Sequence, residues 1–331
     1  MTGSDASVPA YCGVVAIGRN EGDRLKRCLS SAGVADPIVY VDSGSSDGSV
    51  AWTRSQGFEV VELDTSAGFT AARARNAGFR RIKELAPRLQ LVQFVDGDCE
   101  LAEGWLAAGA ALLQQRADAA VVFGRLRERH PERSIYNWLC DREWDGPAGE
   151  VKHCGGNAMM RTAALTAAGG YREELIAGEE PELCVRLRRS GWSVWRIDAE
   201  MGLHDAAMTR FRQWWLRRVR SGYAFAEGSH LHGASPERHW VWESRRAWLW
   251  GFWLPLVCAA AVIIIGPWGL GLLLVYALQL LRRTLQQRGG WRERTRLPLF
   301  ELLGRFGEAE GQLRFAAHRL FKGRSQIIEY K

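Results

Sequence analysis

Cysteine pairs are absent from this 331-residue sequence, although it contains seven cysteines. No two of them form a CxxC motif and their number is odd, so a disulfide framework is not indicated. Free thiols in a reducing compartment are the expectation instead. The N-terminal stretch also lacks a basic segment followed by an apolar core, so we expect no signal peptide.

Acidic residues are scarce in the last part of the chain. Residues 1–204 hold 24 Lys/Arg and 28 Asp/Glu, a net charge of −4, whereas residues 205–331 hold 20 and 9, a net charge of +11. Nine of the 15 tryptophans also lie in this second part. Basic, Trp-rich sequence beside an apolar run indicates an anionic membrane surface. Nucleic acid is the competing interpretation, but RNA-binding motifs and zinc spacings are missing, so no nucleic-acid partner is predicted.

Charged residues are missing altogether from 247–281, a run of 35 positions. A straight helix of that length would measure about 52 Å, against a hydrocarbon core of roughly 30 Å. Gly266-Pro267 divides the run, and two arginines flank each end, which puts both ends on one side if positive charge stays cytoplasmic. We predict a hydrophobic membrane hairpin or re-entrant segment. A single tilted span and a soluble buried helix pair are the alternatives.

Short apolar runs alternate with helical patterns in the first 200 residues. This alternation predicts an α/β fold with a mostly parallel, Rossmann-like sheet flanked by helices, whose ligands bind at the carboxyl ends of the strands. The expected strands are 12–18, 37–42, 58–64, 89–98, 119–129 and the start of 193–205. The expected helices are 22–33, 49–57, 69–85, 103–116, 162–175 and 179–192, with an irregular stretch at 130–160 and an amphipathic, Arg-rich helix at 211–228.

Acidic residues follow two of the expected strands. Asp96 and Asp98 end the strand that begins near residue 89. Acids are common in turns after strands, but two carboxylates one residue apart at this place can hold a divalent cation that also binds phosphate oxygens. Asp42 ends an earlier strand before a Ser/Gly loop, where it could accept a hydrogen bond from a nucleotide base; a simple turn, with Asp47 capping the next helix, is the alternative.

Glu179 and Glu180 precede an amphipathic helix. Acids at a helix N-terminus are favoured by the helix dipole in any case. The functional alternative is that one of them is a general base that deprotonates an acceptor hydroxyl.

Together these elements resemble the family 2 glycosyltransferases, the large family of GT-A-fold sugar transferases, in a membrane-associated bacterial form. The resemblance covers roughly residues 11–205, about 60% of the chain. It is carried, in the order the family shows them, by "AIGRNEGDRLKRCLSS", "VDSGSSDGS", "GFTAARARNAGF", "FVDGDCEL", "CGGNAMMRTAALTAAGGY" and "GEEPELCVRLRRSGW".

The resemblance implies roles for individual residues. Asn20 and Glu21 would begin the nucleotide pocket and Asp42 would contact the base. Arg73, Arg75 and Asn76 would lie near the nucleotide or the DxD loop. Asp96 would contact the nucleotide and the metal, with Asp98 the more direct metal ligand. Gly156 and Asn157, in the Gly155–Asn157 loop, would face donor sugar and acceptor.

Two positions depart from the family pattern. Its Glu-Asp base motif is Glu-Glu here, so the base aligns with Glu180, while Glu179 stays an alternative. His204 matches the place of a third metal ligand in some relatives, although a lone histidine is often structural. The Gln-x-x-Arg-Trp motif of processive synthases is absent.

The resemblance also implies a domain plan, which we extend along the chain as an expectation. It consists of a disordered N-terminus at 1–10, a GT-A glycosyltransferase domain at 11–206, amphipathic basic helices at 207–246, the hydrophobic segment at 247–281, and a basic cytoplasmic tail at 282–331.

The function we expect is that of an inverting, metal-dependent glycosyltransferase on the cytoplasmic face of the inner membrane. Its cofactor would be Mn²⁺ or Mg²⁺ and its donor a UDP- or GDP-sugar. The acceptor would be a polyprenyl-linked or other glycan, as in exopolysaccharide biosynthesis, with membrane lipids as further partners; a homo-oligomer is left open. A sugar nucleotidyltransferase and a catalytically inactive scaffold in a glycan-assembly complex are the alternatives.

Overall fold

The computed structural model describes residues 12–33, 35–66 and 68–321. The chain divides into two units, Met1–Thr209 and Arg210–Lys331, and each is described by itself. The predicted disordered segment 1–10 lies outside the described residues, as do the last ten residues of the predicted tail.

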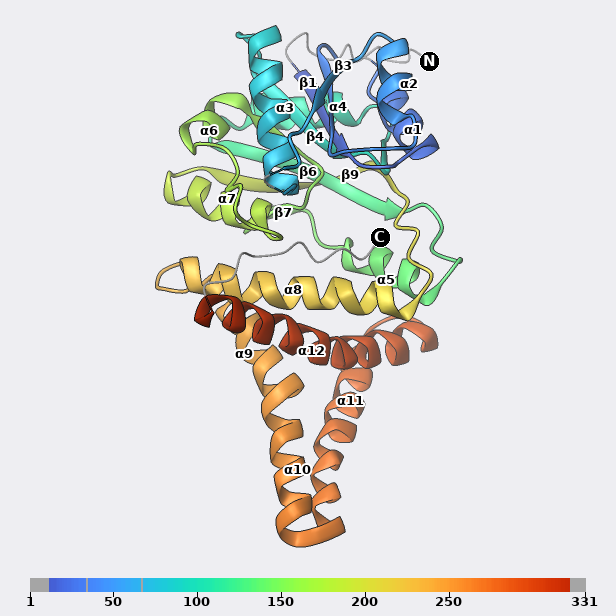
Figure 1. Cartoon of the computed structure of the whole chain (residues 1–331), viewed down its shortest axis with the longest axis vertical. Helices are drawn as coiled ribbons and strands as arrows, with labels where there is room; N and C mark the ends of the chain where they lie inside the picture. The colour runs from blue at the N-terminus through green and yellow to red at the C-terminus, as the bar shows by residue number, and fades with distance from the viewer. Residues whose placement is uncertain (1–11, 34, 67, 322–331) are drawn as a thin grey trace. The chain divides into compact units, whose positions relative to one another are not determined.

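A nine-stranded sheet with helices on both faces forms the first unit (Figure 1). Its strands are β1 Cys12–Gly18, β2 Ile38–Asp42, β3 Glu59–Glu62, β4 Leu91–Asp96, β5 Cys99–Leu101, β6 Ala119–Glu128, β7 Gly149–Val151, β8 Ala158–Arg161 and β9 Ser193–His204. Its helices are α1 Asp23–Ser31, α2 Ser49–Ser55, α3 Ala71–Leu85, α4 Trp105–Gln115, α5 Ile135–Glu143, α6 Thr162–Ala167 and α7 Glu179–Arg189.

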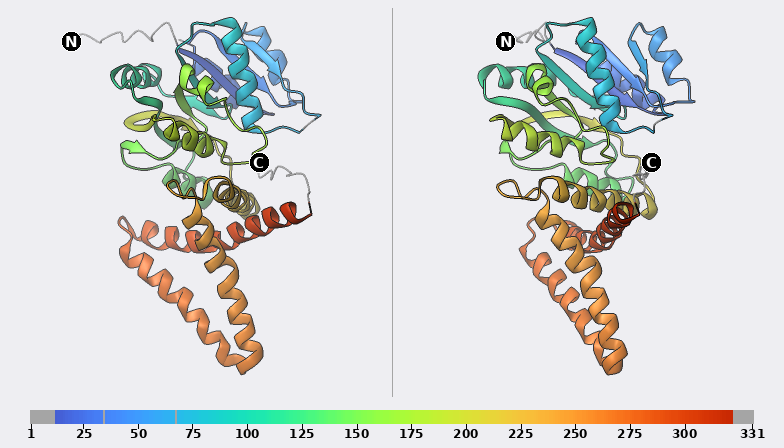
Figure 2. Two further views of the ribbon diagram at one scale, coloured as in Figure 1. Left: turned by 90° about the vertical axis from the view of Figure 1, so that its left-hand side faces the viewer. Right: turned by 60° about the vertical axis from the view of Figure 1, so that its left-hand side comes forward.

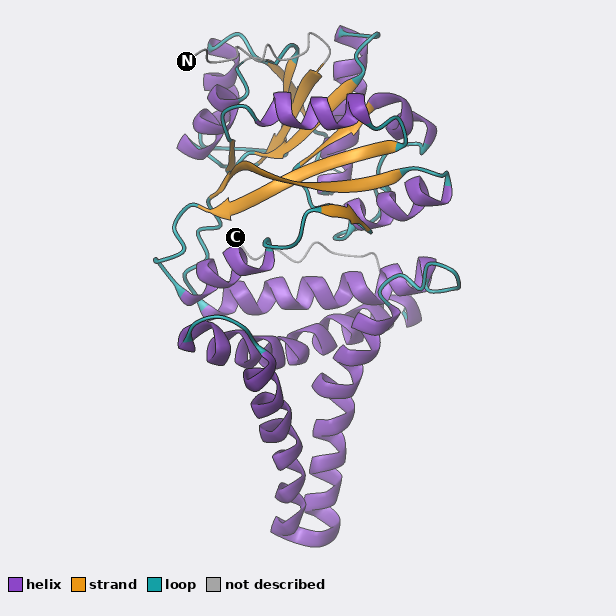
Figure 3. Cartoon of the chain, turned by 180° about the vertical axis from the view of Figure 1, so that it is seen from behind, coloured by secondary structure: helices purple, strands orange, loops and turns teal. Residues whose placement is uncertain are grey.

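Alternating side chains of the central strands enter two separate cores. Val15 of β1 and Val39 of β2 pack with α3, α6 and α7 on one face, whereas Val14 and Tyr40 pack with α1 and α4 on the other. Burial on both faces explains why these strands are almost continuously apolar. The predicted α/β fold class is confirmed, as the layers in Figure 3 show.

The order of strands is β3-β2-β1-β4-β8-β6-β9-β5, with β7 on β9. Pairing is parallel from β3 to β4 and between β6 and β9, but β8 lies antiparallel between β4 and β6. The stretch 130–160, expected to be irregular, supplies α5, β7 and the start of β8. The helix expected at 162–175 ends at Ala167, because Gly169 and Gly170 both have positive φ and cannot continue it.

Helices form all the regular structure described in the second unit. They are α8 Phe211–His232, α9 Val241–Trp248, the π-helical turn η1 Leu249–Trp253, α10 Leu254–Ile265, the 3₁₀ segment η2 Gly266–Leu273, α11 Leu274–Gln286 and α12 Trp291–Leu320. The amphipathic helix expected at 211–228 is α8, and it packs along α12. Gly222 of α8 permits this packing, because a Cβ there would collide with the backbone of Glu308.

The apolar run folds back on itself. In Figures 1 and 2, α10 and α11 form the two arms of a hairpin that reverses through η2. The reversal begins at Gly266, whose φ is +63°, and the Tyr276 hydroxyl donates a hydrogen bond to the Trp250 carbonyl at 2.6 Å across the two arms. Within the described residues, Val241–Gln286 is the one helical stretch whose length and apolar composition would allow it to cross a membrane.

Candidate active site

The carboxyl ends of two strands bring the first two acids together at one edge of the sheet. Gly18 of β1 lies beside Asp42 of β2, and Ile17 lies beside Asp96 of β4. Asp42 and Asp96 therefore emerge on either side of β1, where ligands of such sheets bind.

Asp42 and Asn20 shape the loops at this edge. Asp42 Oδ2 accepts hydrogen bonds from the amides of Gly44 at 2.9 Å and Ser45 at 2.8 Å. The backbone amide of Asn20 donates a hydrogen bond to Ser45 Oγ at 2.8 Å. The side-chain Oδ1 of Asn20 accepts one from the backbone amide of Ser46, also at 2.8 Å. These bonds join the ends of β1 and β2 into one rigid wall.

Arg75 of α3 lies at the centre of an acidic cluster. Its side chain is buried, with Nη2 2.9 Å from Asp96 Oδ1 and Nη1 2.8 Å from Glu179 Oε1 and 2.6 Å from Glu180 Oε1. Both glutamates belong to the first turn of α7, which begins after Gly178. One guanidinium therefore fixes the predicted DxD loop relative to both candidate bases.

Burial raises the pKa of the Glu180 carboxyl to about 7. The positive charge of Arg75 opposes this rise, and the negative charges of Glu179 and Asp96 add to it. A carboxyl whose pKa lies near neutrality is suited to accept a proton during a reaction.

The Gly155–Asn157 loop closes over this cluster. A Cβ on Gly156 would lie 2.5 Å from Arg75 Nη2 and 2.9 Å from Asp96 Oδ2, so a larger residue would have to displace one of these side chains. Asn157 Oδ1 accepts a hydrogen bond from the Asp96 amide at 3.0 Å. The loop thus packs directly on Arg75 and Asp96, which the family resemblance places near the donor nucleotide.

Replacing Gly156 with alanine is expected to displace Arg75 or Asp96, because the ion pairs hold the guanidinium in place. We expect the free energy of unfolding to fall by about 1–3 kcal/mol and kcat/KM for sugar transfer to fall at least about tenfold. Gly155→Ala is the matched control, since no described atom beyond its chain neighbours lies within 4 Å of its Cβ position. Equal effects of the two substitutions in denaturant titrations and rate assays would contradict this packing argument.

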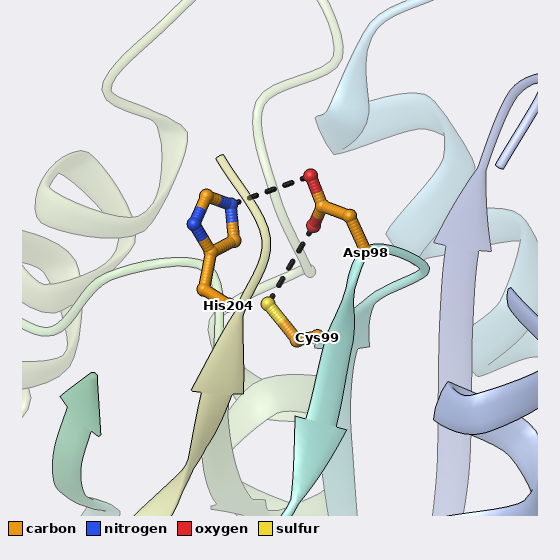
Figure 4. Close-up of side chains that lie close together, drawn as sticks. All are labelled: Asp98, Cys99 and His204. Carbon is orange, nitrogen blue, oxygen red and sulfur yellow. Dashed lines mark hydrogen bonds and ion pairs between the residues drawn. The ribbon is translucent and has the colours of Figure 1, made fainter. Parts of the chain in front are cut away.

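Asp98 and His204 form a second group, which Figure 4 shows together with Cys99. Asp98 is buried, and its Oδ2 lies 3.3 Å from His204 Nε2. The pairing of β5 with β9 brings them together by placing Cys99 opposite His204. Ligand atoms of these three residues lie within 4.8 Å of one another.

A divalent cation fits the oxygen and nitrogen atoms of this group. Asp98 Oδ2 and His204 Nε2 face each other, and both can give a lone pair to a cation. The Cys99 thiol is a poorer ligand, because burial raises its pKa well above the usual range and the charge of Asp96 raises it further.

Glu128 of β6 lies beside His204, and the sequence alone did not identify it as a site residue. Its Oε2 lies 3.6 Å from His204 Nδ1, on the opposite side of the ring from Asp98. A carboxylate at this place orients an imidazole for metal binding. No motif marks Glu128; the register of β6 with β9, which sets Glu128 opposite His204, brings it into the site.

Three residues expected at the nucleotide have other partners in the structure. Arg73 donates hydrogen bonds to backbone carbonyls of the loop before α3. Asn76 forms hydrogen bonds with the backbone that follows Gly169-Gly170. Glu21 forms an ion pair with a residue nearby in the chain. The contacts are those of Arg73 with Asp64 and Gly68, of Asn76 with Tyr171 and Glu173, and of Glu21 with Arg24. Only Arg75 of the α3 trio contacts the DxD loop among these described contacts.

Comparison with known proteins gives a family match. Residues 14–165 match the model of a protein family described as "Glycosyl transferase family 2". No curated protein matches the chain.

Two solved structures are similar in fold. A mannosyltransferase from Pyrobaculum calidifontis, in complex with GDP-Man and Mn²⁺, has a TM-score of 0.62 at 18% identity, over 93% of this chain and 88% of that one. S. aureus TarS 1–349, in complex with UDP-GlcNAc, has a TM-score of 0.50 at 14% identity, over 92% of each chain. At these identities the likeness shows the fold.

Proposed function

Because residues 14–165 of the chain belong to glycosyl transferase family 2, we propose that its glycosyl transfer uses a UDP- or GDP-sugar as donor and inverts the configuration at C1. The structures similar in fold support a nucleotide-sugar donor, since one holds GDP-Man and the other UDP-GlcNAc. The observation that carries the proposal is the single buried guanidinium of Arg75 joining Asp96 to Glu179 and Glu180.

The wall formed by Asn20 and Asp42 would receive the nucleotide, and Glu21, next to Asn20 in the chain, would border it. Asp42 Oδ2 accepts from two loop amides and Oδ1 accepts from the Tyr40 hydroxyl at 2.9 Å, so one lone pair of Oδ1 remains to accept a hydrogen bond from a base. Arg73 and Asn76 would act indirectly, by holding the loops around α3.

Asp98 and His204, with Asp96 beside them, would hold a divalent cation. When bound, such an ion neutralises the diphosphate of the donor. An imidazole in the ligand set favours Mn²⁺ over Mg²⁺, which prefers oxygen ligands, and the P. calidifontis structure contains Mn²⁺.

Glu180 would be the general base. It takes the proton of an acceptor hydroxyl while the hydroxyl oxygen forms a bond to C1 of the sugar. The bond from C1 to the diphosphate oxygen breaks on the opposite face, and the configuration at C1 is inverted. Gly156 and Asn157 border the space where sugar and acceptor would meet.

The rate of transfer is expected to fall as the pH falls through about 7, because protonated Glu180 cannot accept a proton. The free enzyme should show this acid limb in kcat/KM, with a slope of about one logarithmic unit per pH unit. The measurement is a pH–rate profile at constant ionic strength and saturating Mn²⁺. A profile that is flat between about pH 5 and 8 would exclude Glu180 as the base.

A lipid-linked acceptor, such as a polyprenyl-diphosphate sugar, fits the hairpin. The arm from residue 247 to 265 is about 28 Å long at 1.5 Å per residue, close to the roughly 30 Å of a hydrocarbon core. Both arms end in arginines, which supports insertion from the cytoplasmic side of the inner membrane. Exopolysaccharide or envelope glycan assembly is the corresponding process.

The acceptor is tested by supplying purified full-length protein with a radiolabelled nucleotide sugar and two acceptors. We expect label in the organic-extractable polyprenyl-linked product and little in a soluble oligosaccharide. Equal use of the soluble acceptor would remove the support for a lipid-linked one. Formation of a nucleotide sugar from sugar phosphate and nucleoside triphosphate would favour a nucleotidyltransferase instead.

A further inference from the structure

Three arginines from three helices meet at the base of the hairpin. Arg246 of α9, Arg283 of α11 and Arg305 of α12 line one pocket. Its other walls include Trp250, Leu280 and Glu301. Three positive side chains therefore face one carboxylate across this pocket.

The nearby carboxylates do not balance these charges. Glu301 pairs with Arg283 at 2.7 Å. The buried Glu308 pairs with Arg305 at 2.6 Å and also with Arg218 outside the pocket. No described residue forms an ion pair or hydrogen bond with the guanidinium of Arg246, although the charges of Glu301 and Glu243 act on it.

The pKa values of two of these arginines also indicate that negative charge is lacking at the pocket. Burial, together with the charges of Arg246 and Arg218, lowers the pKa of Arg305 to about 9. Burial and the charge of Arg283 lower the pKa of Arg246. A bound anion would remove this mutual repulsion.

The pocket lies where the apolar surface begins. Arg246 directly precedes the charge-free run and Arg283 follows it by one residue. Beyond these residues the hairpin exposes large apolar side chains, among them Trp253, Leu256, Leu278 and Leu281. If the hairpin enters a bilayer, as proposed above, the pocket lies at the depth of the lipid headgroups.

We propose that Arg246, Arg283 and Arg305 bind the phosphate group of an anionic membrane lipid. Guanidinium groups bind phosphate oxygens through paired N–H donors, so three of them around one pocket can hold a phosphate in a defined place. The inference rests on the proposed membrane insertion but not on the transfer chemistry. Its test measures binding alone, so its failure would leave the transferase assignment standing.

Native mass spectrometry of the full-length protein in nonionic detergent, titrated with phosphatidylglycerol, tests this site. Arg246→Gln is expected to weaken binding about tenfold or more, because one charged hydrogen-bonding group is lost. Arg245→Gln is the matched control: it removes the same charge from the neighbouring residue, which is exposed and outside the pocket. Equal weakening by both would mean diffuse attraction and would overturn the proposal.

Two further measurements identify the ligand and check the fold. Inorganic phosphate and phosphatidylcholine should bind far more weakly than phosphatidylglycerol; phosphate binding of equal strength would overturn the lipid assignment in favour of a free-anion site. Without lipid, Arg246→Gln should not lower the thermal midpoint, because it relieves repulsion with Arg283. A lower midpoint would contradict the unbalanced charge on which the site depends.

Discussion

Replacing Asp98 with asparagine is expected to lower kcat/KM for sugar transfer on the order of 10³-fold while the protein stays folded. Asp98 Oδ2 lies 3.3 Å from His204 Nε2. Asparagine has nearly the same shape but no charge, so the pair would lose most of its affinity for a divalent cation. Initial rates at saturating Mn²⁺, with circular dichroism and thermal unfolding for the fold, measure the effect.

Glu200→Gln is a suitable control on the same strand as His204. Glu200 forms a surface ion pair with Arg127 at 2.7 Å, and both side chains are about half exposed. Its loss should change the free energy of unfolding by no more than about 0.5 kcal/mol and leave the rate unchanged. An Asp98→Asn variant with the parental rate would show that this pair holds no essential cation.

Replacing Glu180 with glutamine is expected to lower kcat by roughly 10²–10⁴-fold. Glu179→Gln should cost less than about tenfold, although both carboxylates contact the same nitrogen of Arg75. The difference follows from position: the Glu180 side chain is 11% exposed against 5% for Glu179, and Glu180 Oε1 lies under Gly156. Each substitution alters one of the three carboxylate contacts of Arg75, so the rates of the two variants make a matched comparison.

The pH profile separates a base from a positioning group. Glu180→Gln should remove the acid limb near pH 7, whereas Glu179→Gln should keep it. Glu180→Asp should retain part of the activity, because a carboxylate remains. A larger loss in Glu179→Gln, with the limb gone, would assign the base to Glu179.

Apolar periodicity was sufficient to predict the first half of the sheet. The strands β1, β2 and β4 are buried on both faces, so their sequences are almost continuous apolar runs. The edge strand β3 is only partly buried, and its two central valines mark it in the sequence. The antiparallel strand β8 could not be predicted, because it is short and follows a stretch with no clear period. The sequence predicts a basic tail at 282–331 but gives no helix there, because the contacts of α12 with α8 are tertiary and leave no local signal.

The site residues also divide into those that the local sequence predicts and those that only the structure reveals. Asp42, Asp96 and Asp98 follow strands, so local sequence was enough to propose them. Arg75 was one of three candidates on α3, and only the structure shows that it alone joins Asp96 to the glutamates. Glu128 had no local signal, because its place opposite His204 depends on the pairing of two strands far apart in the chain.

Thermal unfolding of the full-length protein with a panel of UDP- and GDP-sugars, with and without Mn²⁺, tests the central claim most directly. One nucleotide sugar is expected to raise the unfolding midpoint only when Mn²⁺ is present, corresponding to about 2.7 kcal/mol at a ligand concentration of 100 Kd. The Asp98→Asn variant should show no such rise. A stabilisation that needs no metal and persists in Asp98→Asn, or none with any nucleotide sugar, would contradict the account.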